Sequence, residues 1–216
     1  MSIEAYVKKQ QGQSNYEIQK SRAGQLLATH DLQASSARLG LRFDGSHVYI
    51  KLFDLSCRVR CSDGYADCAA SSGGEFREAD FNTAMTLYDL LGYASPDAHP
   101  AGDYAPLESF SRIYNARSYA GEGAFTDTAQ EFDLAFGKLA PACEALGGVP
   151  FGKGDVSCRI PLFKDLCMVL SFWRADDEFP PSLILSFDRN TTQYLHYETM
   201  WYAAGLCVRR IRAHFS

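Results

Sequence analysis

The stretch that decides the fold is residues 166–201, LCMVLSFWRADDEFPPSLILSFDRNTTQYLHYETMW. It contains two apolar runs, residues 167–173 and 183–187, which have the length and the bounding residues of buried strands. The connector between them is acidic and ends in Pro180 and Pro181, which have no amide hydrogen to give to a sheet. We therefore predict a β-hairpin with a loop that is stiff at its exit.

A closing helix is predicted after the hairpin. Asp188 ends the second strand, and residues 190–192 supply turn and cap chemistry. The apolar residues beyond them have helical spacing, and they are Tyr197, Trp201, Ala204, Val208, Ile211 and Phe215. Arginines in the last turns complement the negative end of the helix dipole.

Three helices are predicted in the first part of the chain. A capping box that begins at Ser14 opens a helix that continues to Thr29. Its inward-facing residues are expected to be Tyr16, Ala23, Leu26 and Leu27. Asp31 caps a shorter helix that stops at Gly40, and Asp80 caps a third.

The sequence predicts strands, a loop and a further helix outside these three helices. Residues 41–61 alternate between apolar and polar, which predicts an antiparallel meander with one buried face. Residues 62–74 are mostly small and are expected to form a flexible loop. A capping box at Thr128 opens a further helix, which Pro141 is expected to kink or split.

Together these elements predict a single α+β domain, residues 1–216, in which helices cover a largely antiparallel sheet. The meander and the hairpin are expected to build that sheet. Residues 95–106 are rich in Pro and Gly and could act as a flexible joint. No internal repeat is detected in the sequence.

Charge and hydropathy argue against two classes of protein. The net charge of -5 and the pI near 5.5 argue against a nucleic-acid-binding protein, because phosphate contacts need a basic face. No apolar run approaches the roughly 18 residues of a membrane span, and residues 1–13 lack the apolar core of a signal peptide. We expect a cytoplasmic protein that contacts neither nucleic acid nor membrane.

Seven cysteines are scattered along the chain. Cys57, Cys61 and Cys68 match no common zinc or cluster spacing. Cys57 and Cys61 would stand about 13 Å apart along one strand, which is too far for them to share a metal. We expect most of the seven to be buried free thiols, and we assign no metal ligand.

The candidate site is acidic. The hairpin loop holds Asp176, Asp177 and Glu178, and three adjacent carboxylates are expected to need a cation or an arginine nearby, because like charges raise one another's pKa. A hard cation such as magnesium or calcium suits carboxylate oxygens. The alternative is that these are solvated turn residues and that Asp188 accepts hydrogen bonds from the amides that follow it.

Histidine and aromatic residues complete the candidate site. His196 can exchange protons near neutral pH, and the neighbouring aromatic residues could line an apolar pocket or could be core. The predicted ligand-binding residues are Trp173, Asp176, Asp177, Glu178, Asp188, His196 and Trp201. The sequence identifies no catalytic residue and no cofactor.

Short motifs run through the later part of the chain, and they are Leu146-Gly147-Gly148, Gly154-Asp155, Pro161, Trp173, Asp177-Glu178-Phe179-Pro180, Ile184-Leu185 and Phe187-Asp188. In these motifs the chain resembles a bacterial and archaeal family that is described only as a domain of unknown function. Some members of that family are found with iron-sulfur modules or in anaerobes that use corrinoid one-carbon chemistry, whereas this chain has no C-x2-C module. The resemblance implies an accessory role in such metabolism and supplies no catalytic residue.

Three hypotheses for the function follow. The first is a binding or accessory domain without a catalytic template, for a protein partner or a small ligand. The second is a metal-assisted enzyme that uses the acidic hairpin loop. The third is an accessory protein of anaerobic redox or corrinoid one-carbon metabolism, which rests on the resemblance alone.

Overall fold

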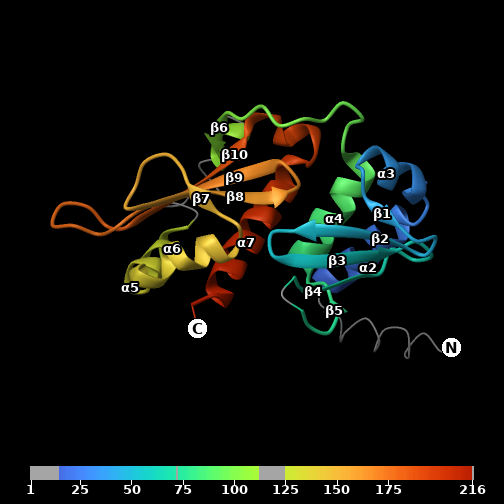
Figure 1. Cartoon of the computed structure of the whole chain (residues 1–216), viewed down its shortest axis with the longest axis horizontal. Helices are drawn as coiled ribbons and strands as arrows, with labels where there is room; N and C mark the ends of the chain where they lie inside the picture. Colours follow the sequence, from blue (N-terminus) through green and yellow to red (C-terminus); the bar gives the residue numbers. More distant parts are fainter. Residues whose placement is uncertain (1–14, 72, 112–124, 216) are drawn as a thin grey trace.

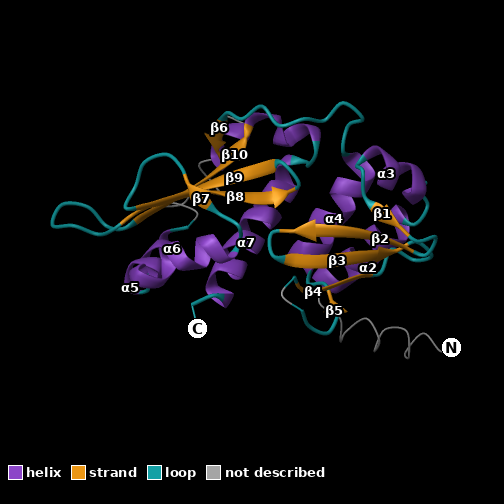
Figure 2. Ribbon diagram, viewed as in Figure 1, coloured by secondary structure: helices purple, strands orange, loops and turns teal. Residues whose placement is uncertain are grey.

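The computed structural model describes residues 15–71, 73–111 and 125–215, and it shows an α+β fold with two antiparallel sheets (Figures 1 and 2). The first sheet contains, in spatial order, β1 (Arg42–Phe43), β2 (His47–Leu52), β3 (Leu55–Arg60), β4 (Ala66–Ala70) and β5 (Arg77–Glu78). The second contains β6 (Tyr104–Pro106), β10 (Ser182–Asp188), β9 (Leu166–Trp173), β8 (Val156–Phe163) and β7 (Val149–Pro150). The α+β class is confirmed, but the meander and the hairpin lie in two sheets and not in one.

Helices accompany both sheets. Those of the first part are α2 (Asn15–Leu27), α3 (Leu32–Arg38) and α4 (Phe81–Tyr93), and those of the later part are α5 (Thr126–Leu134), α6 (Phe136–Ala145) and α7 (Tyr197–Ala213). Two short 3-10 helices are η1 (Leu107–Phe110) and η3 (Arg189–Gln193). Helix α4 packs against α7, and the buried apolar residues of both parts form one cluster. No described helix is long and apolar enough to cross a membrane.

The order of elements repeats along the chain. Two helices, a short strand, a three-stranded meander and a closing helix occur first in residues 15–93 and again in residues 126–213. We call these segments the first half and the second half, and Figure 1 shows them side by side. A glycine with positive φ follows the second helix of each half, at 59° for Gly40 and 78° for Gly147. The similar order is a feature of the structure, although β5, between β4 and α4, has no counterpart in the second half.

Local signals predicted many element boundaries correctly. The hairpin of β9 and β10 and the closing helix α7 are present as expected. Asp31 accepts a hydrogen bond from the Ala34 amide at 2.9 Å, and Asp80 accepts one from the Thr83 amide at 3.1 Å. These caps begin α3 and α4 as predicted.

Other local predictions are wrong. Tyr16 and Leu26 were expected to face inward, but their side chains are 63% and 65% exposed. Residues 62–74 were expected to form a loop, yet they contain β4, whose residues are buried or half-buried in the first sheet. The helix expected to begin near Thr128 begins at Thr126, and it breaks at Ala135 instead of at Pro141, which lies inside α6. Ser14 and residues 112–124 lie outside the described residues.

Two glycines dock α2 onto the first sheet. Gly64, in the turn between β3 and β4, has a φ of 71°, and a Cβ atom placed on it would overlap the carbonyl oxygen of Gly24 in α2. The backbones of the helix and the turn therefore approach more closely than any side chain would allow.

This contact predicts a large effect of Gly64→Ala. We expect the substitution to lower the free energy of unfolding by about 3 kcal/mol, because an unfavourable left-handed conformation adds to a backbone clash. The matched control is Gly45→Ala, since Gly45 also has a positive φ of 90° but has nothing within 4 Å of its Cβ position. Its cost should be about 1–2 kcal/mol. Equal losses in urea denaturation of the two variants would contradict the docking role of Gly64.

Candidate functional site

The two halves are joined at their hairpin turns. The backbone amide of Phe53, in the turn between β2 and β3, donates a hydrogen bond to the carbonyl oxygen of Leu162 at 3.1 Å. Leu162 lies where the register between β8 and β9 shifts, between Pro161 and Phe163. A residue at such a bulge leaves the sheet ladder, so its carbonyl is open to another partner. This hydrogen bond links the two sheets.

An ion pair ties the last helix to the same turn. Asp54 accepts hydrogen bonds from two guanidinium nitrogens of Arg210 in α7, at 2.8 and 2.7 Å, and His214 Nε2 lies 2.9 Å from its second oxygen. Burial raises the pKa of Asp54, but the hydrogen bonds with Arg210 and His214 lower it further, so the net pKa lies below the ordinary value of 3.8. Asp54 is therefore ionised at neutral pH, and Arg210 neutralises its charge.

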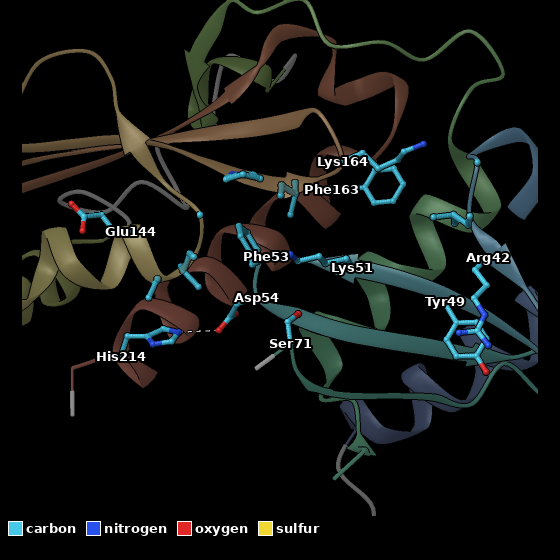
Figure 3. Close-up of a pocket in the computed structure, with 17 residues that line it drawn as sticks. Arg42, Tyr49, Lys51, Phe53, Asp54, Ser71, Glu144, Phe163, Lys164 and His214 are labelled. Atoms are coloured by element: carbon cyan, nitrogen blue, oxygen red, sulfur yellow. Dashed lines mark hydrogen bonds and ion pairs between the residues drawn. The ribbon is translucent and has the colours of Figure 1, made fainter. Parts of the chain in front are cut away.

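An open cleft of about 690 Å³ lies where the halves meet. Ligand sites in proteins usually measure roughly 300–1,000 Å³. The first half contributes residues 40–42 and the β2–β3 hairpin, and the second half contributes the end of α6 and the β8–β9 turn. Figure 3 shows these side chains around the cleft, with the hydrogen bond between Asp54 and His214 drawn as a dashed line. Both halves are needed to form this cleft.

The lining of the cleft is more basic than the chain as a whole. It includes the basic residues Arg42, Lys51 and Lys164 and the carboxylates Asp54 and Glu144. The charge of Asp54 is already matched by Arg210. The cleft is therefore positive, although the chain carries a net charge of -5.

The three basic side chains have different surroundings. Lys164 Nζ donates to the Leu39 carbonyl oxygen at 2.8 Å, so it caps the C-terminal end of α3 from the other half. The Arg42 guanidinium lies over the Tyr49 ring, 4.4 Å from its centroid. Within residues 15–71, 73–111 and 125–215, neither Arg42 nor Lys51 forms an ion pair. Both cations are therefore available to an anionic ligand.

Backbone strain is concentrated at this cleft. Phe53 and Lys164 both have a φ of 51°, and they are the non-glycine residues with positive φ in the described part of the chain. Each is the first residue of the β2–β3 or the β8–β9 turn, and both line the cleft. A bulky residue in this conformation costs about 1–2 kcal/mol, and such strain is often found at functional sites.

The fold and the cleft define an α+β protein with two similarly ordered halves that enclose a basic groove. Comparison of sequences identifies its family: the family model described as "Domain of unknown function (DUF3786)" matches residues 31–210. The chain therefore belongs to the DUF3786 family, in agreement with the resemblance seen in its motifs. No curated protein and no solved structure matches the chain.

The acidic residues predicted from the sequence lie on an exposed loop. Asp176, Asp177 and Glu178 are solvent-exposed between β9 and β10, in a hairpin that extends away from the rest of the molecule (Figure 1). Asp176 accepts hydrogen bonds from the amides of Glu178 and Phe179 at 2.8 and 2.7 Å, which lowers its pKa. Within the described residues, no group of three or more His, Cys, Asp or Glu side chains could hold a metal ion.

Of the other predicted site residues, Trp173 lies next to that loop, whereas Asp188, His196 and Trp201 do not. Asp188 lies at the far end of β10 and is fully buried, where it accepts hydrogen bonds from the amides of Ala101, Gly102 and Asn190 at 2.7–2.9 Å. His196 Nδ1 lies 2.6 Å from Asp89. The remaining two residues are Trp173, which is 36% exposed at the end of β9, and Trp201, which stacks on Phe125. Ligand binding by these residues stays a prediction.

The cleft residues were missed because their signals are weak in sequence. Asp54 matches no motif in the sequence, and Arg210 and His214 lie among other basic residues at the end of the closing helix. Their meeting depends on how α7 of one half crosses a turn of the other. Leu-Gly recurs at Leu39-Gly40 and Leu146-Gly147 beside the cleft, but it also occurs at Leu91-Gly92 inside α4, so it does not mark the site.

The ion pair predicts a pH-dependent effect of Asp54→Asn. At pH 7 we expect a loss of about 2 kcal/mol in the free energy of unfolding, because charged hydrogen bonds are removed at a mostly buried site. Since the folded-state pKa of Asp54 is lowered, its contribution is complete above the unfolded value of 3.8 and is lost as the pH falls through the folded value. The difference between wild type and variant should therefore shrink in acid.

The control for this measurement is Asp63→Asn. Asp63 also accepts two hydrogen bonds from one arginine, Arg60, but both side chains are more than 40% exposed. The loss should be no more than about 1 kcal/mol for an exposed pair. If Asp63→Asn lowers the free energy of unfolding as much as Asp54→Asn does, the ion pair between the halves stabilises the fold no more than an exposed ion pair.

The acidic loop predicts little affinity for divalent cations. Because no described group could supply three ligands, we expect millimolar calcium or magnesium to leave the melting temperature unchanged. A rise in melting temperature that disappears in Asp177→Ala would contradict this expectation and would support a metal at the loop. Fluorescence of Trp173, which lies next to the loop, gives a second readout.

Proposed function

We propose that the protein is a binding domain that holds a small organic anion in the cleft between its two halves. The observation that carries the proposal is a cleft of ligand size with two basic residues, Arg42 and Lys51, that have no carboxylate partner in the described chain. Such cations bind carboxylate or phosphate oxygens by charge-assisted hydrogen bonds.

The walls of the cleft indicate the rest of the ligand. Leu41, Phe53, Pro161 and Phe163 line it beside the basic residues. Ligand sites commonly combine apolar walls with a few polar groups that fix orientation. We therefore infer an anion that also has an apolar part, such as a ring.

The polar residues of the cleft support binding more than hydrolysis. His214 hydrogen-bonds to Asp54 and shares the cleft with Ser71, a set of residue types also found in hydrolase triads. However, the Ser71 hydroxyl lies 3.3 Å from the Ser56 hydroxyl, and no described hydrogen bond joins it to His214. This supports a structural role for the histidine in holding the turn.

The redox state of the cysteines supports a cellular compartment for the protein. All seven are free, which fits a reducing compartment such as the cytoplasm. We infer a cytoplasmic binding domain for a small ligand. An association with iron-sulfur or corrinoid proteins stays a prediction from the family resemblance.

The proposal is tested with phenyl phosphate, which combines an apolar ring with a dianion. We expect saturable binding in isothermal titration calorimetry. Phenol, which has the ring without the phosphate, and inorganic phosphate, which has the charge without the ring, should each bind more weakly. Arg42→Gln and Lys51→Gln should each raise Kd about tenfold or more, because a charge-assisted hydrogen bond contributes about 1.5–3 kcal/mol.

Lys153→Gln is the matched control. Lys153 is exposed in the loop between β7 and β8 and does not line the cleft, so the same change in charge should leave Kd unchanged. If the control weakens binding as much as Lys51→Gln does, the affinity comes from net charge and the cleft is not the site. The absence of binding by phenyl phosphate and by a panel of aromatic carboxylates would also contradict the proposal.

A further inference from the structure

Two cysteines face each other across neighbouring strands of the first sheet. Cys57 of β3 is directly opposite Cys68 of β4 in the sheet register. The Arg60 amide donates to the Tyr65 carbonyl, and the Ser71 amide donates to the Asp54 carbonyl. The even-numbered residues of β3 therefore exchange backbone hydrogen bonds with the residues opposite them on β4. Cys57 is odd-numbered, so Cys57 and Cys68 form a non-hydrogen-bonded pair.

This kind of pair brings side chains close together. The Cα atoms of a non-hydrogen-bonded pair lie about 4.5 Å apart, and a disulfide spans Cα distances of about 4.4–6.8 Å. The two thiols are also close enough for each to shift the pKa of the other. A disulfide can therefore form here with little movement of the backbone.

The two thiols differ in accessibility and in acidity. Cys57 is 2% exposed, whereas Cys68 is only partly buried. The interaction between the two thiols lowers the pKa of Cys68 and raises the pKa of Cys57. Asp67 and Asp80 oppose the ionisation of Cys68, and Arg210 favours it. Cys68 is therefore the thiol that a reagent reaches and that reacts as a thiolate.

A second pair of cysteines provides a contrast inside the same protein. Cys143 of α6 and Cys158 of β8 also lie close enough to interact, but they are only 1% and 5% exposed. The interaction with Cys158, together with burial, raises the pKa of Cys143 far above its ordinary value. Neither thiol of this pair is accessible to a reagent.

We propose that Cys57 and Cys68 form a reversible thiol–disulfide site that reacts with small disulfides such as glutathione disulfide. The proposal is independent of the ligand proposed for the cleft. It gives these cysteines a chemical role that needs no metal.

The reaction proceeds in two balanced exchanges. The Cys68 thiolate attacks one sulfur of glutathione disulfide, which forms a mixed disulfide and releases one glutathione thiolate. The Cys57 thiol then gives up its proton and attacks Cys68 Sγ, which forms the protein disulfide and releases the second glutathione. Each glutathione leaves as a thiol after it takes up a proton, so one disulfide has been reduced and one formed.

The test uses the full chain, fully reduced and then incubated with excess glutathione disulfide at neutral pH. We expect the accessible thiol count to fall, the intact mass to lose two hydrogen atoms, and peptide mapping to link Cys57 to Cys68. In Cys57→Ala the mixed disulfide should accumulate on Cys68, because no second thiol is opposite to resolve it. Dithiothreitol should restore the starting mass in both proteins.

Cys61→Ser is the matched control. Cys61 follows Cys57 by four positions and is also partly exposed, but Ser46 and not a cysteine lies across from it. This variant should form the Cys57–Cys68 disulfide like the wild type. A disulfide between Cys143 and Cys158, glutathione on Cys61 or Cys167 in preference to Cys68, or no loss of thiols in the folded wild type would each overturn the proposal.

Discussion

The structure depends on one point of contact, where the hairpin turns of two similarly ordered halves meet. The amide of Phe53 reaches the carbonyl of Leu162 because a bulge removes that carbonyl from its own ladder. Asp54, the next residue in the turn, is held by Arg210 from the closing helix of the other half. These few atoms join the turns of the two sheets, beside the packing of α4 against α7 and the shared apolar core.

The apolar core and these polar contacts have different roles. The core contains many fully buried residues, among them Leu52, Phe132, Phe172 and Phe187. Burial of each such side chain stabilises the fold by about 1.5–3 kcal/mol, so the core far outweighs a single ion pair of about 2 kcal/mol. Hydrophobic burial has no direction, however. The hydrogen bonds and the ion pair are what fix the halves at the geometry that leaves the cleft open.

The strain at the two turns fits the same account. Phe53 and Lys164 adopt a left-handed conformation that glycine would adopt at no cost. Phe53 instead supplies a nearly buried ring, and Lys164 supplies a cap for α3 of the other half. The side chains that join the halves and line the cleft therefore occupy the positions where the backbone is least favourable.

Much of the secondary structure could be predicted from the sequence, because its signals are local. Asp31 and Asp80 are helix caps, and the apolar runs of β9 and β10 are bounded by polar turn residues. The tertiary arrangement could not be predicted in this way. The halves share their order of elements but few residues, and nothing local separates one sheet from two.

The candidate site shows the same limit. The loop of Asp176 to Glu178 is conspicuous in composition, yet its side chains point into solvent and Asp188 satisfies backbone amides. The cleft instead draws on segments from residue 40 to residue 214, which come together only through the crossing of the halves. A positive φ at Phe53 or Lys164 leaves no trace in the sequence, since neither residue is glycine.

The most direct test of the account is a heteronuclear NMR titration of the labelled protein with phenyl phosphate. If the ligand binds between the halves, the largest amide shifts will fall on residues of both, including Gly40 and Phe53 of the first and Gly147 and Lys164 of the second. Shifts confined to one half, or to the exposed loop of residues 174–181, would contradict a binding site formed by the meeting of the two hairpin turns.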